Sequence, residues 1–376
     1  MLFLNNGKYI IPRKPGDGLS IYSNATGDSS MKIVKMALIG AGLWGKGHAE
    51  IYATHPNAVL KAVCDAKTDR AREIAALYNA NAYDDYNEML KKEDIDAVAV
   101  VTPDFAHAAP ALAAAAAGKH ILLEKPLATT KTDAVAICQA VKENKIQLMV
   151  DFHGRWNPPS YIMKQDIDSG KIGKVVSAYL RHNDTIYVPT QMLSWAAKSS
   201  IIWFLGSHAV DTLSWLLSDR VKRVFSVSSH GILQRRGIDT EDLFQSTLEF
   251  EKGAVAQVEN SWVVPNGNPH INDFKLNVTG ESGMFNMDFS HSQFFERYLE
   301  NTMDHPDFLV TTQVQGKPFG LGYESIRDFV ECIAEDKPVK VKLQEALNVT
   351  MTLLAIKRSA ASREPVEVEH INVDDV

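Results

Sequence analysis

The sequence has few cysteines and no excess of basic charge. Its three cysteines, Cys64, Cys138 and Cys332, form no CxxC pair among 376 residues. Isolated thiols in an odd number predict neither a disulfide framework nor a zinc site, so we expect a reducing compartment and a cytoplasmic protein. The net charge is −7, whereas a nucleic-acid-binding protein usually carries a basic excess. We therefore expect no nucleic-acid partner.

Long hydrophobic runs are missing as well. The alanine-rich stretch at residues 108–117 contains Pro110 and is far shorter than the roughly 20 apolar residues that span a bilayer. We therefore expect no membrane partner. Hydrophobic residues make up 45% and charged residues 23% of the chain, as in ordinary globular proteins. This composition excludes a disordered chain and a collagen-like repeat, and the length suits two or three domains.

Residues 1–31 differ from the rest of the chain. They mix Asn, Gly, Pro and Ser with scattered apolar residues, and they lack the basic and apolar regions of a signal peptide. Two interpretations are open: a weakly ordered native arm, or an extension from an upstream start with Met31 as the natural first residue. We favour the second. The remainder is divided into residues 32–151 and 152–376, because the pattern changes after Asp151.

Short apolar runs alternate with helical patterns between residues 32 and 151. A near-continuous apolar run such as residues 95–101 is typical of a parallel strand that is covered on both faces. Alternation of this kind predicts an α/β domain with a doubly wound parallel sheet of the Rossmann type. The predicted strands are residues 33–39, 59–64, 95–101, 121–123 and 146–150.

After Asp151 the predicted strands are longer and have fewer helices between them. Several alternate polar and apolar residues, as in an open sheet with one covered face. The pattern predicts an α+β domain with a large, mainly antiparallel open sheet. Its predicted strands are residues 175–180, 221–228, 243–250, 254–264 and 274–278.

A glycine motif joins the first predicted strand to the first helix. Gly40, Gly42 and Gly45 fill the pattern G-x-G-x-x-G, and Asp65 ends the next strand. The glycines permit a tight turn, close approach of a pyrophosphate and close packing of the helix, whose N-terminus faces the anion. A carboxylate at position 65 binds ribose hydroxyls and repels a 2′-phosphate. The motif therefore predicts NAD as the cofactor and disfavours NADP.

Further motifs follow in order along the chain. Glu124-Lys125-Pro126 follows the fourth strand, residues 151–157 follow the last one, and residues 206–211 carry His208. A Thr-Gly-Glu-Ser-Gly turn at residues 279–283 and a closing helix and strand at residues 355–368 complete the series. With these motifs, the sequence resembles the Gfo/Idh/MocA oxidoreductase family (glucose–fructose oxidoreductase, inositol dehydrogenase and relatives) over about residues 32–368.

The resemblance implies an NAD(P)-dependent dehydrogenase that acts on the CH–OH group of a sugar, sugar acid or cyclic polyol. It also implies that the C-terminal sheet domain closes over the nicotinamide, and that a homodimer or homotetramer forms through the open face of that sheet. Motif and resemblance together predict the following cofactor-binding residues: Gly40, Gly42, Leu43, Trp44, Gly45, Asp65, Thr102, Pro103, His107, Glu124 and Lys125.

Two residues match the family's catalytic pair. Oxidation of an alcohol needs a base that titrates near neutral pH. By resemblance, Lys125 binds and polarises the reacting oxygen and His208 accepts its proton; desolvation would lower the pKa of such a lysine. Where the family's dehydrogenases commonly carry an aspartate, four residues before this histidine, the sequence has Phe204. The candidates to replace that carboxylate or to transfer the proton are Asp151, Asp184, Asp211, His153 and His182.

Substrate binding is predicted for Lys125, His153, Arg155, Asn157 and His208. Arg155 has two open interpretations, a two-pronged hydrogen bond to an anionic substrate group or a structural salt bridge at the domain junction. The histidines show no HxxxH or HExxH spacing, so no metal site is predicted.

Three functions are compatible with these features. The leading one is an NAD-dependent dehydrogenase of a small sugar or polyol. The second is redox-neutral, NAD-dependent cleavage of a glycoside by oxidation, elimination and reduction, which Phe204 favours modestly. The third is a protein that senses NAD or a sugar without turnover. The presence of Lys125 and His208 argues against the third, although fold analogy alone does not exclude it.

Overall fold

The computed structural model describes residues 4–5, 8–9, 32–290 and 295–376, and it divides into two units, Met1–Met31 and Lys32–Val376. In the first unit, β1 (Leu4–Asn5) pairs antiparallel with β2 (Lys8–Tyr9). The rest of the predicted N-terminal extension lies outside the described residues, and its two interpretations stay open. All further description concerns the second unit.

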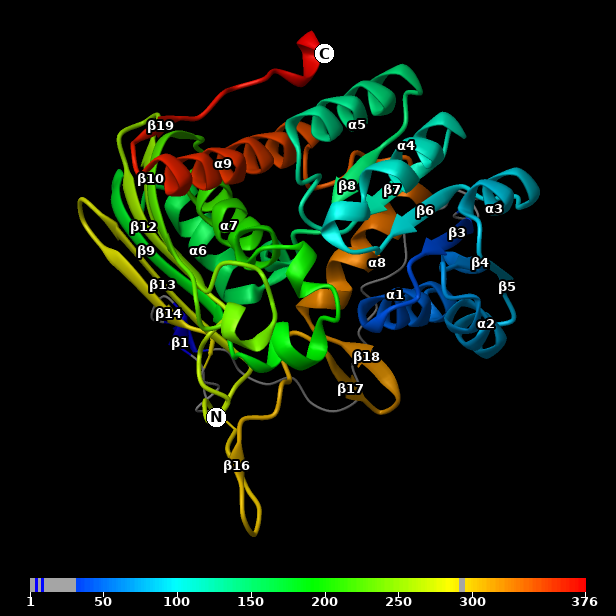
Figure 1. Cartoon of the computed structure of the whole chain (residues 1–376), viewed down its shortest axis with the longest axis horizontal. Coiled ribbons are helices and arrows are strands. Elements are labelled where there is room, and N and C mark those ends of the chain that lie inside the picture. Colours follow the sequence, from blue (N-terminus) through cyan, green and yellow to red (C-terminus); the bar gives the residue numbers. More distant parts are fainter. Residues whose placement is uncertain (1–3, 6–7, 10–31, 291–294) are drawn as a thin grey trace. The chain divides into compact units, whose positions relative to one another are not determined.

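A six-stranded parallel sheet confirms the predicted Rossmann-type domain (Figure 1). The strand order is β5-β4-β3-β6-β7-β8. The short strand β5 was not predicted, because three residues with one large side chain give no apolar run. The strands are β3 (Val34–Ile39), β4 (Ala58–Cys64), β5 (Asn81–Tyr83), β6 (Ala97–Val100), β7 (His120–Leu123) and β8 (Leu148–Val150).

Helices cover this sheet, and the order of its strands creates a crevice. All four residues of β6 are buried, as the unbroken apolar run requires. The chain moves from β3 to β4 on one side and returns to β6 on the other. Ligands bind at such a reversal, beyond the carboxyl ends of the strands. The helices are α1 (Leu43–Thr54), α2 (Thr68–Leu77), α3 (Tyr86–Lys92), α4 (Ala108–Ala116) and α5 (Lys131–Glu143).

A second, seven-stranded sheet confirms the predicted α+β architecture. Its order is β14-β13-β9-β12-β11-β10-β19, and every pairing is antiparallel except that of β9 with β12. The polar end of β9 extends the predicted strand by four residues to Asp184. The strands are β9 (Val175–Asp184), β10 (Val221–Ser229), β11 (Leu243–Phe250), β12 (Val255–Ser261), β13 (Asn272–Gly280), β14 (Met284–Asp288) and β19 (Val366–Glu367).

Three helices pack on one face of the large sheet: α6 (Pro158–Asp168), α7 (Ser207–Leu217) and α9 (Leu343–Ser362) (Figure 1). The opposite face exposes Tyr179, Phe225, Val227 and Val255, each about 40% accessible. Helix α8 (Leu321–Ala334) instead packs beside α1 and the parallel sheet. The proposed domain boundary after Asp151 falls between β8 and the short helix η2 (His153–Trp156).

Smaller elements complete the fold. Two short hairpins precede α8, formed by β15 (Arg297–Tyr298) with β16 (Met303–Asp304) and by β17 (Thr312–Val314) with β18 (Lys317–Phe319). The one-turn helix η5 (Ile202–Gly206) leads directly into α7. Among the helices of the described residues, none combines the length and the apolar character that crossing a membrane would need.

Candidate active site

The glycine loop is built as a pyrophosphate site requires. Gly40 has φ +106°, and a Cβ there would lie 2.4 Å from the Val101 carbonyl oxygen. A Cβ at Gly45 would lie 2.2 Å from the Gly40 carbonyl oxygen, so the helix packs too closely for any side chain. By contrast, a Cβ at Gly42 would meet no heavy atom within 4 Å. That open space lies at the N-terminus of α1, where a helix attracts an anion.

Asp65 holds the loop in place. Its Oδ2 accepts a hydrogen bond of 2.8 Å from the Ala41 backbone N–H, and its Oδ1 accepts one of 2.8 Å from Lys67 N–H. Each carboxylate oxygen can accept more than one hydrogen bond, so ribose hydroxyls can still bind. The open space at Gly42 and this carboxylate together fit NAD.

The remaining predicted cofactor residues line the same side of the sheet. Trp44 packs against His153 and Tyr323, with ring centroids 5.7 and 6.4 Å away, whereas Leu43 is 74% exposed. Thr102 and Pro103 follow β6, and the Thr102 hydroxyl donates to the Ala106 carbonyl. The His107 ring lies 2.8 Å from the Pro126 carbonyl oxygen and 3.0 Å from that of Thr102. It therefore braces the two loops that follow β6 and β7.

Lys125 reaches from the end of β7 into the second domain. Its Nζ donates a 2.8 Å hydrogen bond to the Phe204 carbonyl oxygen and lies 4.1 Å from the centroid of the Phe204 ring. Burial lowers the pKa of Lys125, and the opposing charges of Glu124, Asp104, Asp184 and Asp151 do not fully compensate. A lysine with a lowered pKa exchanges a proton more readily near neutral pH.

Three histidines meet beside this lysine. The His208 ring lies 4.7 Å from that of His153 and 5.9 Å from that of His182. Burial lowers the pKa of His153 to about 4 and that of His182 to about 3, and it lowers the pKa of His208 well below its ordinary value. The charge of Lys125 acts in the same direction on His182 and His208. All three rings are therefore neutral near pH 7, and the lowered pKa values make each of them a weak base.

Arg155 does not belong to this group. Its Nε and Nη2 donate to the two oxygens of Asp211 at 3.0 and 2.6 Å, and its Nη1 donates to Glu345 at 2.7 Å. The guanidinium is 8% exposed. This geometry favours the structural salt bridge over the anion-binding interpretation, and it also removes Asp211 from the candidates for a catalytic carboxylate.

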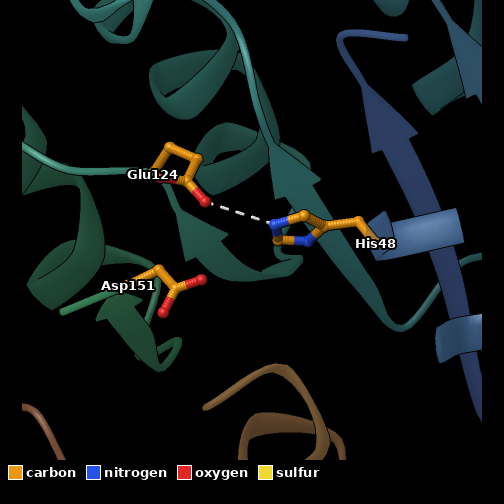
Figure 2. A group of neighbouring side chains, drawn as sticks. All are labelled: His48, Glu124 and Asp151. Atoms are coloured by element: carbon orange, nitrogen blue, oxygen red, sulfur yellow. Dashed lines mark hydrogen bonds and ion pairs between the residues drawn. The ribbon is translucent and has the colours of Figure 1, made fainter. Parts of the chain in front are cut away.

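Figure 2 shows a buried group that the sequence did not predict. His48 from α1, Glu124 after β7 and Asp151 after β8 place one nitrogen and two oxygens within 4.8 Å of one another. His48 Nε2 lies 3.3 Å from Glu124 Oε1, and His48 Nδ1 lies 3.0 Å from the Tyr52 hydroxyl. These residue types can hold a metal ion.

Without a cation, electrostatics place a proton in this group. Burial and the charge of Glu124 raise the pKa of Asp151 well above its ordinary value. Burial also acts to raise the pKa of Glu124, but the hydrogen bond and charge of His48, with Lys125 and His153, outweigh it and lower that pKa to about 2. Asp151 is thus neutral beside an ionised Glu124. The two carboxyl groups hold one proton and carry one negative charge between them.

Several buried polar atoms on or next to η2, β9 and β12 have no hydrogen-bond partner among the described residues. In the described part of the chain, hydrogen-bond partners are lacking for the following: His153 Nδ1, His182 Nδ1, Asn157 Oδ1, Asp184 Oδ2, Asn260 Oδ1 and Trp262 Nε1. Buried polar atoms are normally satisfied, so such a concentration indicates a place for a polar ligand. His182 and Asp184 lie two residues apart and share one face of β9.

Two family models match this chain. Residues 34–152 match the model described as the oxidoreductase family with an NAD-binding Rossmann fold, and residues 162–286 match that of the GFO/IDH/MocA C-terminal domain. The matches cover the parallel sheet, the large sheet except β19 and the end of β14, and the segments that carry Gly40, Lys125 and His208.

Individual relatives agree with the family models. Levoglucosan dehydrogenase of Pseudarthrobacter phenanthrenivorans is 28% identical over 394 residues, covering 91% of this chain and 100% of that protein. Inositol 2-dehydrogenase 3 of Saccharopolyspora erythraea is 31% identical over 256 residues, covering 66% and 72%. Among solved structures, a levoglucosan dehydrogenase in complex with NADH matches with a TM-score of 0.76 at 26% identity, covering 90% and 100%.

Proposed function

The chain belongs to the Gfo/Idh/MocA family of NAD-binding oxidoreductases, and on this premise we propose that it oxidises a CH–OH group of a neutral sugar or cyclic polyol with NAD. The observation that carries the proposal is the convergence of Lys125, His153, His182 and His208 at the carboxyl edge of the nucleotide-binding sheet. These residues come from four separate segments of the chain: the turn after β7, η2, β9 and α7.

The two catalytic roles follow from the chemistry of the side chains. Lys125 binds and polarises the reacting oxygen with an ammonium that burial makes easy to deprotonate. Burial lowers the pKa of His208, so its ring is neutral and has a nitrogen for the hydroxyl proton, but a nearby negative charge is needed to hold that proton. Bound NAD supplies the hydride acceptor. His153 and Asn157, whose buried Nδ1 and Oδ1 lack partners among the described residues, orient the substrate.

The state of Arg155 favours a neutral substrate over a sugar acid. A bound carboxylate would need a cation with free donors, and the guanidinium donates instead to Asp211 and Glu345. Lys125 is needed at the reacting oxygen. The unpaired atoms around the histidines include acceptors and donors of neutral side chains, which suit hydroxyl groups. An anhydrosugar such as levoglucosan and the inositols are therefore the first compounds to test.

Redox-neutral cleavage of a glycoside is the second candidate, and Phe204 favours it. The ring and carbonyl of this residue face Lys125 Nζ, in the place where the family's dehydrogenases commonly carry a carboxylate. In that reaction, bound NAD would oxidise the sugar, an elimination would release the aglycone, and NADH would return the hydride.

Absorbance at 340 nm separates the two reactions. The purified protein is mixed with NAD or NADP and with levoglucosan, inositols, aldoses, sugar acids and glycosides. Dehydrogenation of a neutral polyol predicts a steady rise with NAD, larger than with NADP because Asp65 disfavours a 2′-phosphate. A flat trace together with released aglycone and protein-bound NAD would instead establish cleavage. A flat trace with neither would overturn both proposals.

The exposed sheet face supports a homo-oligomer, which forms a separate part of the proposal. The four exposed residues lie on β9 (Tyr179), β12 (Val255) and β10 (Phe225 and Val227), within a run of four adjacent strands that also includes β11. Exposed apolar patches often mark interfaces. We expect a dimer or tetramer by light scattering after gel filtration. Phe225→Asp should shift the mass toward the monomer, whereas a wild-type monomer would contradict the assignment.

A further inference from the structure

The reaction site lacks the carboxylate that the proposed chemistry calls for. Lys125 carries a positive charge there, and a proton taken up by His208 would add a second in a buried place. The neighbouring His153 and His182 are neutral and offer no compensation. Position 204, one turn before His208, holds a phenylalanine. The ionised Glu124 offsets the charge of Lys125, so the proton on His208 calls for one more carboxylate from another element.

Four carboxylates act electrostatically on Lys125: Glu124, Asp104, Asp184 and Asp151. Three of them have other roles. Glu124 contacts His48, Asp151 shares that buried group, and Asp104 accepts hydrogen bonds from the Ser199 hydroxyl and Phe105 N–H. Asp184 remains, and it comes from the second sheet, on the side of the histidines.

Asp184 is held firmly by one oxygen only. Its side chain is 1% exposed, and Oδ1 accepts a hydrogen bond from the Asn272 amide in the register partner on β13. Oδ2 is buried and has no hydrogen-bond partner of normal geometry among the described residues. The Trp262 indole acts as a donor that lowers the pKa of Asp184, although neither Trp262 Nε1 nor Asp184 Oδ2 has a hydrogen-bond partner of normal geometry among the described residues.

The position on β9 directs this carboxylate to the reaction site. Asp184 and His182 share a strand face, and the His182 ring contacts the His208 ring at 5.9 Å. Burial raises the pKa of Asp184 to about 7, with Lys125, Trp262 and Asn272 opposing the rise. The group therefore titrates in the range where acid–base groups of enzymes work.

We propose that Asp184 is a further catalytic residue, whose Oδ2 accepts a hydrogen bond from a substrate hydroxyl and whose negative charge stabilises the protonated His208. This inference rests on the proposed dehydrogenase function. In the reaction, the hydroxyl O–H bond breaks and the proton moves to His208. The C–H bond breaks and its hydride passes to NAD, and the C=O bond forms. Asp184 stays ionised throughout. It supplies the carboxylate that the family's dehydrogenases commonly carry at the position of Phe204.

Asp184→Asn tests the inference, because the amide keeps the shape and removes the charge. We expect kcat/KM to fall by about 100-fold, and the decline of kcat/KM as pH falls through about 7 to disappear. Asp273→Asn is the matched control, since Asp273 lies on the adjacent strand β13 and pairs with Arg181 on the opposite sheet face. It should keep the wild-type rate and pH profile.

The outcomes distinguish the inference from the function on which it rests. Wild-type protein without turnover on any compound would defeat the proposed function itself. If the wild type is active and the Asp184→Asn variant folds, two results would each overturn the role of Asp184 alone. One is an unchanged rate, and the other is a decline of kcat/KM that persists as pH falls through about 7. If Asp184→Asn fails to fold by circular dichroism, Asp184→Glu decides. Because its carboxylate is displaced, Asp184→Glu should keep the decline of kcat/KM at low pH and lose most of kcat. Wild-type values of both quantities would overturn the inference.

Discussion

Two charged clusters that share the short helix η2, which carries both His153 and Arg155, differ in how completely their polar atoms are paired. Around Arg155, three guanidinium nitrogens donate to Asp211 and Glu345. Around Lys125, the neutral histidines and Asp184 leave buried nitrogen and oxygen atoms without partners in the described residues. A fully paired cluster stabilises the fold, whereas an incompletely paired one is ready for a polar ligand. Both clusters contain a cation and carboxylates, so residue type does not distinguish the structural cluster from the functional one. The degree of hydrogen-bond pairing does.

The largest expected effect comes from the incompletely paired cluster. Lys125→Met keeps the length of the side chain and removes its charge. Turnover should fall by about 1,000-fold or more, because polarisation of the reacting oxygen is lost. NAD binding should persist, since the Gly40–Gly45 loop and Asp65 are untouched. Steady-state kinetics and NAD titration by tryptophan fluorescence measure the two effects.

Lys131→Met is the control for that variant, because Lys131 lies on the surface and pairs with Glu369. It should leave both readouts unchanged. Full activity of Lys125→Met would remove the lysine from the mechanism.

The paired cluster should respond in stability. Arg155→Ala leaves the buried Asp211 carboxylate, 2% exposed, without its partner, and breaking a buried ion pair costs about 3–5 kcal/mol. Urea denaturation should show this loss. Arg223→Ala removes an equally close but exposed pair with Glu249, which should cost about 1 kcal/mol or less.

Equal losses in the two arginine variants would contradict the contrast between the clusters. A stable Arg155→Ala variant that no longer binds substrate would restore the anion-binding interpretation of Arg155.

A further effect on stability concerns the proton on Asp151. Because its pKa is raised in the folded protein, the native state binds more protons than the unfolded state above about pH 4. Stability should therefore fall as pH rises, by at most about 1.4 kcal/mol per pH unit for one proton. Asp151→Asn should abolish that part of the dependence. The difference between wild type and variant in unfolding free energy, measured from pH 5 to pH 8, checks it.

The pH difference also distinguishes a proton from a metal ion in the group of His48, Glu124 and Asp151. A divalent cation would make wild-type stability sensitive to a chelator, and it would reverse the pH trend because protons would compete with the metal. Either result would contradict the protonated state of Asp151.

The sequence predicted those parts of the site that are local in the chain. The glycine loop, Asp65 and Lys125 each sit at the end of a strand whose apolar run is plain, so motif and place agree. Within the two large sheets, no strand was predicted at β5 or β14, which are short or half exposed and give no continuous apolar run. The short hairpin strands β15 to β18 were not predicted either.

Contacts between distant segments could not be predicted in the same way. His48, Glu124 and Asp151 are separated by 76 and 27 positions along the sequence, and only the parallel order of β3, β6, β7 and β8 brings their segments together. The last residues of β9 were not predicted, because the sequence His182-Asn183-Asp184 is polar. The strand continues there because β13 stays paired with it as far as Asp184, although the pairing with β12 ends at Arg181. This unpredicted end of β9 carries Asp184, the carboxylate that we assign to the reaction.

The most direct test of this account is NAD reduction at 340 nm by the wild-type protein with matched neutral and acidic substrates, for example an inositol or anhydrosugar against the corresponding sugar acids. The account predicts that absorbance rises with a neutral polyol and NAD and stays flat with every sugar acid, because Arg155 is already paired. A rise with sugar acids alone, or no rise with any neutral polyol, would contradict it.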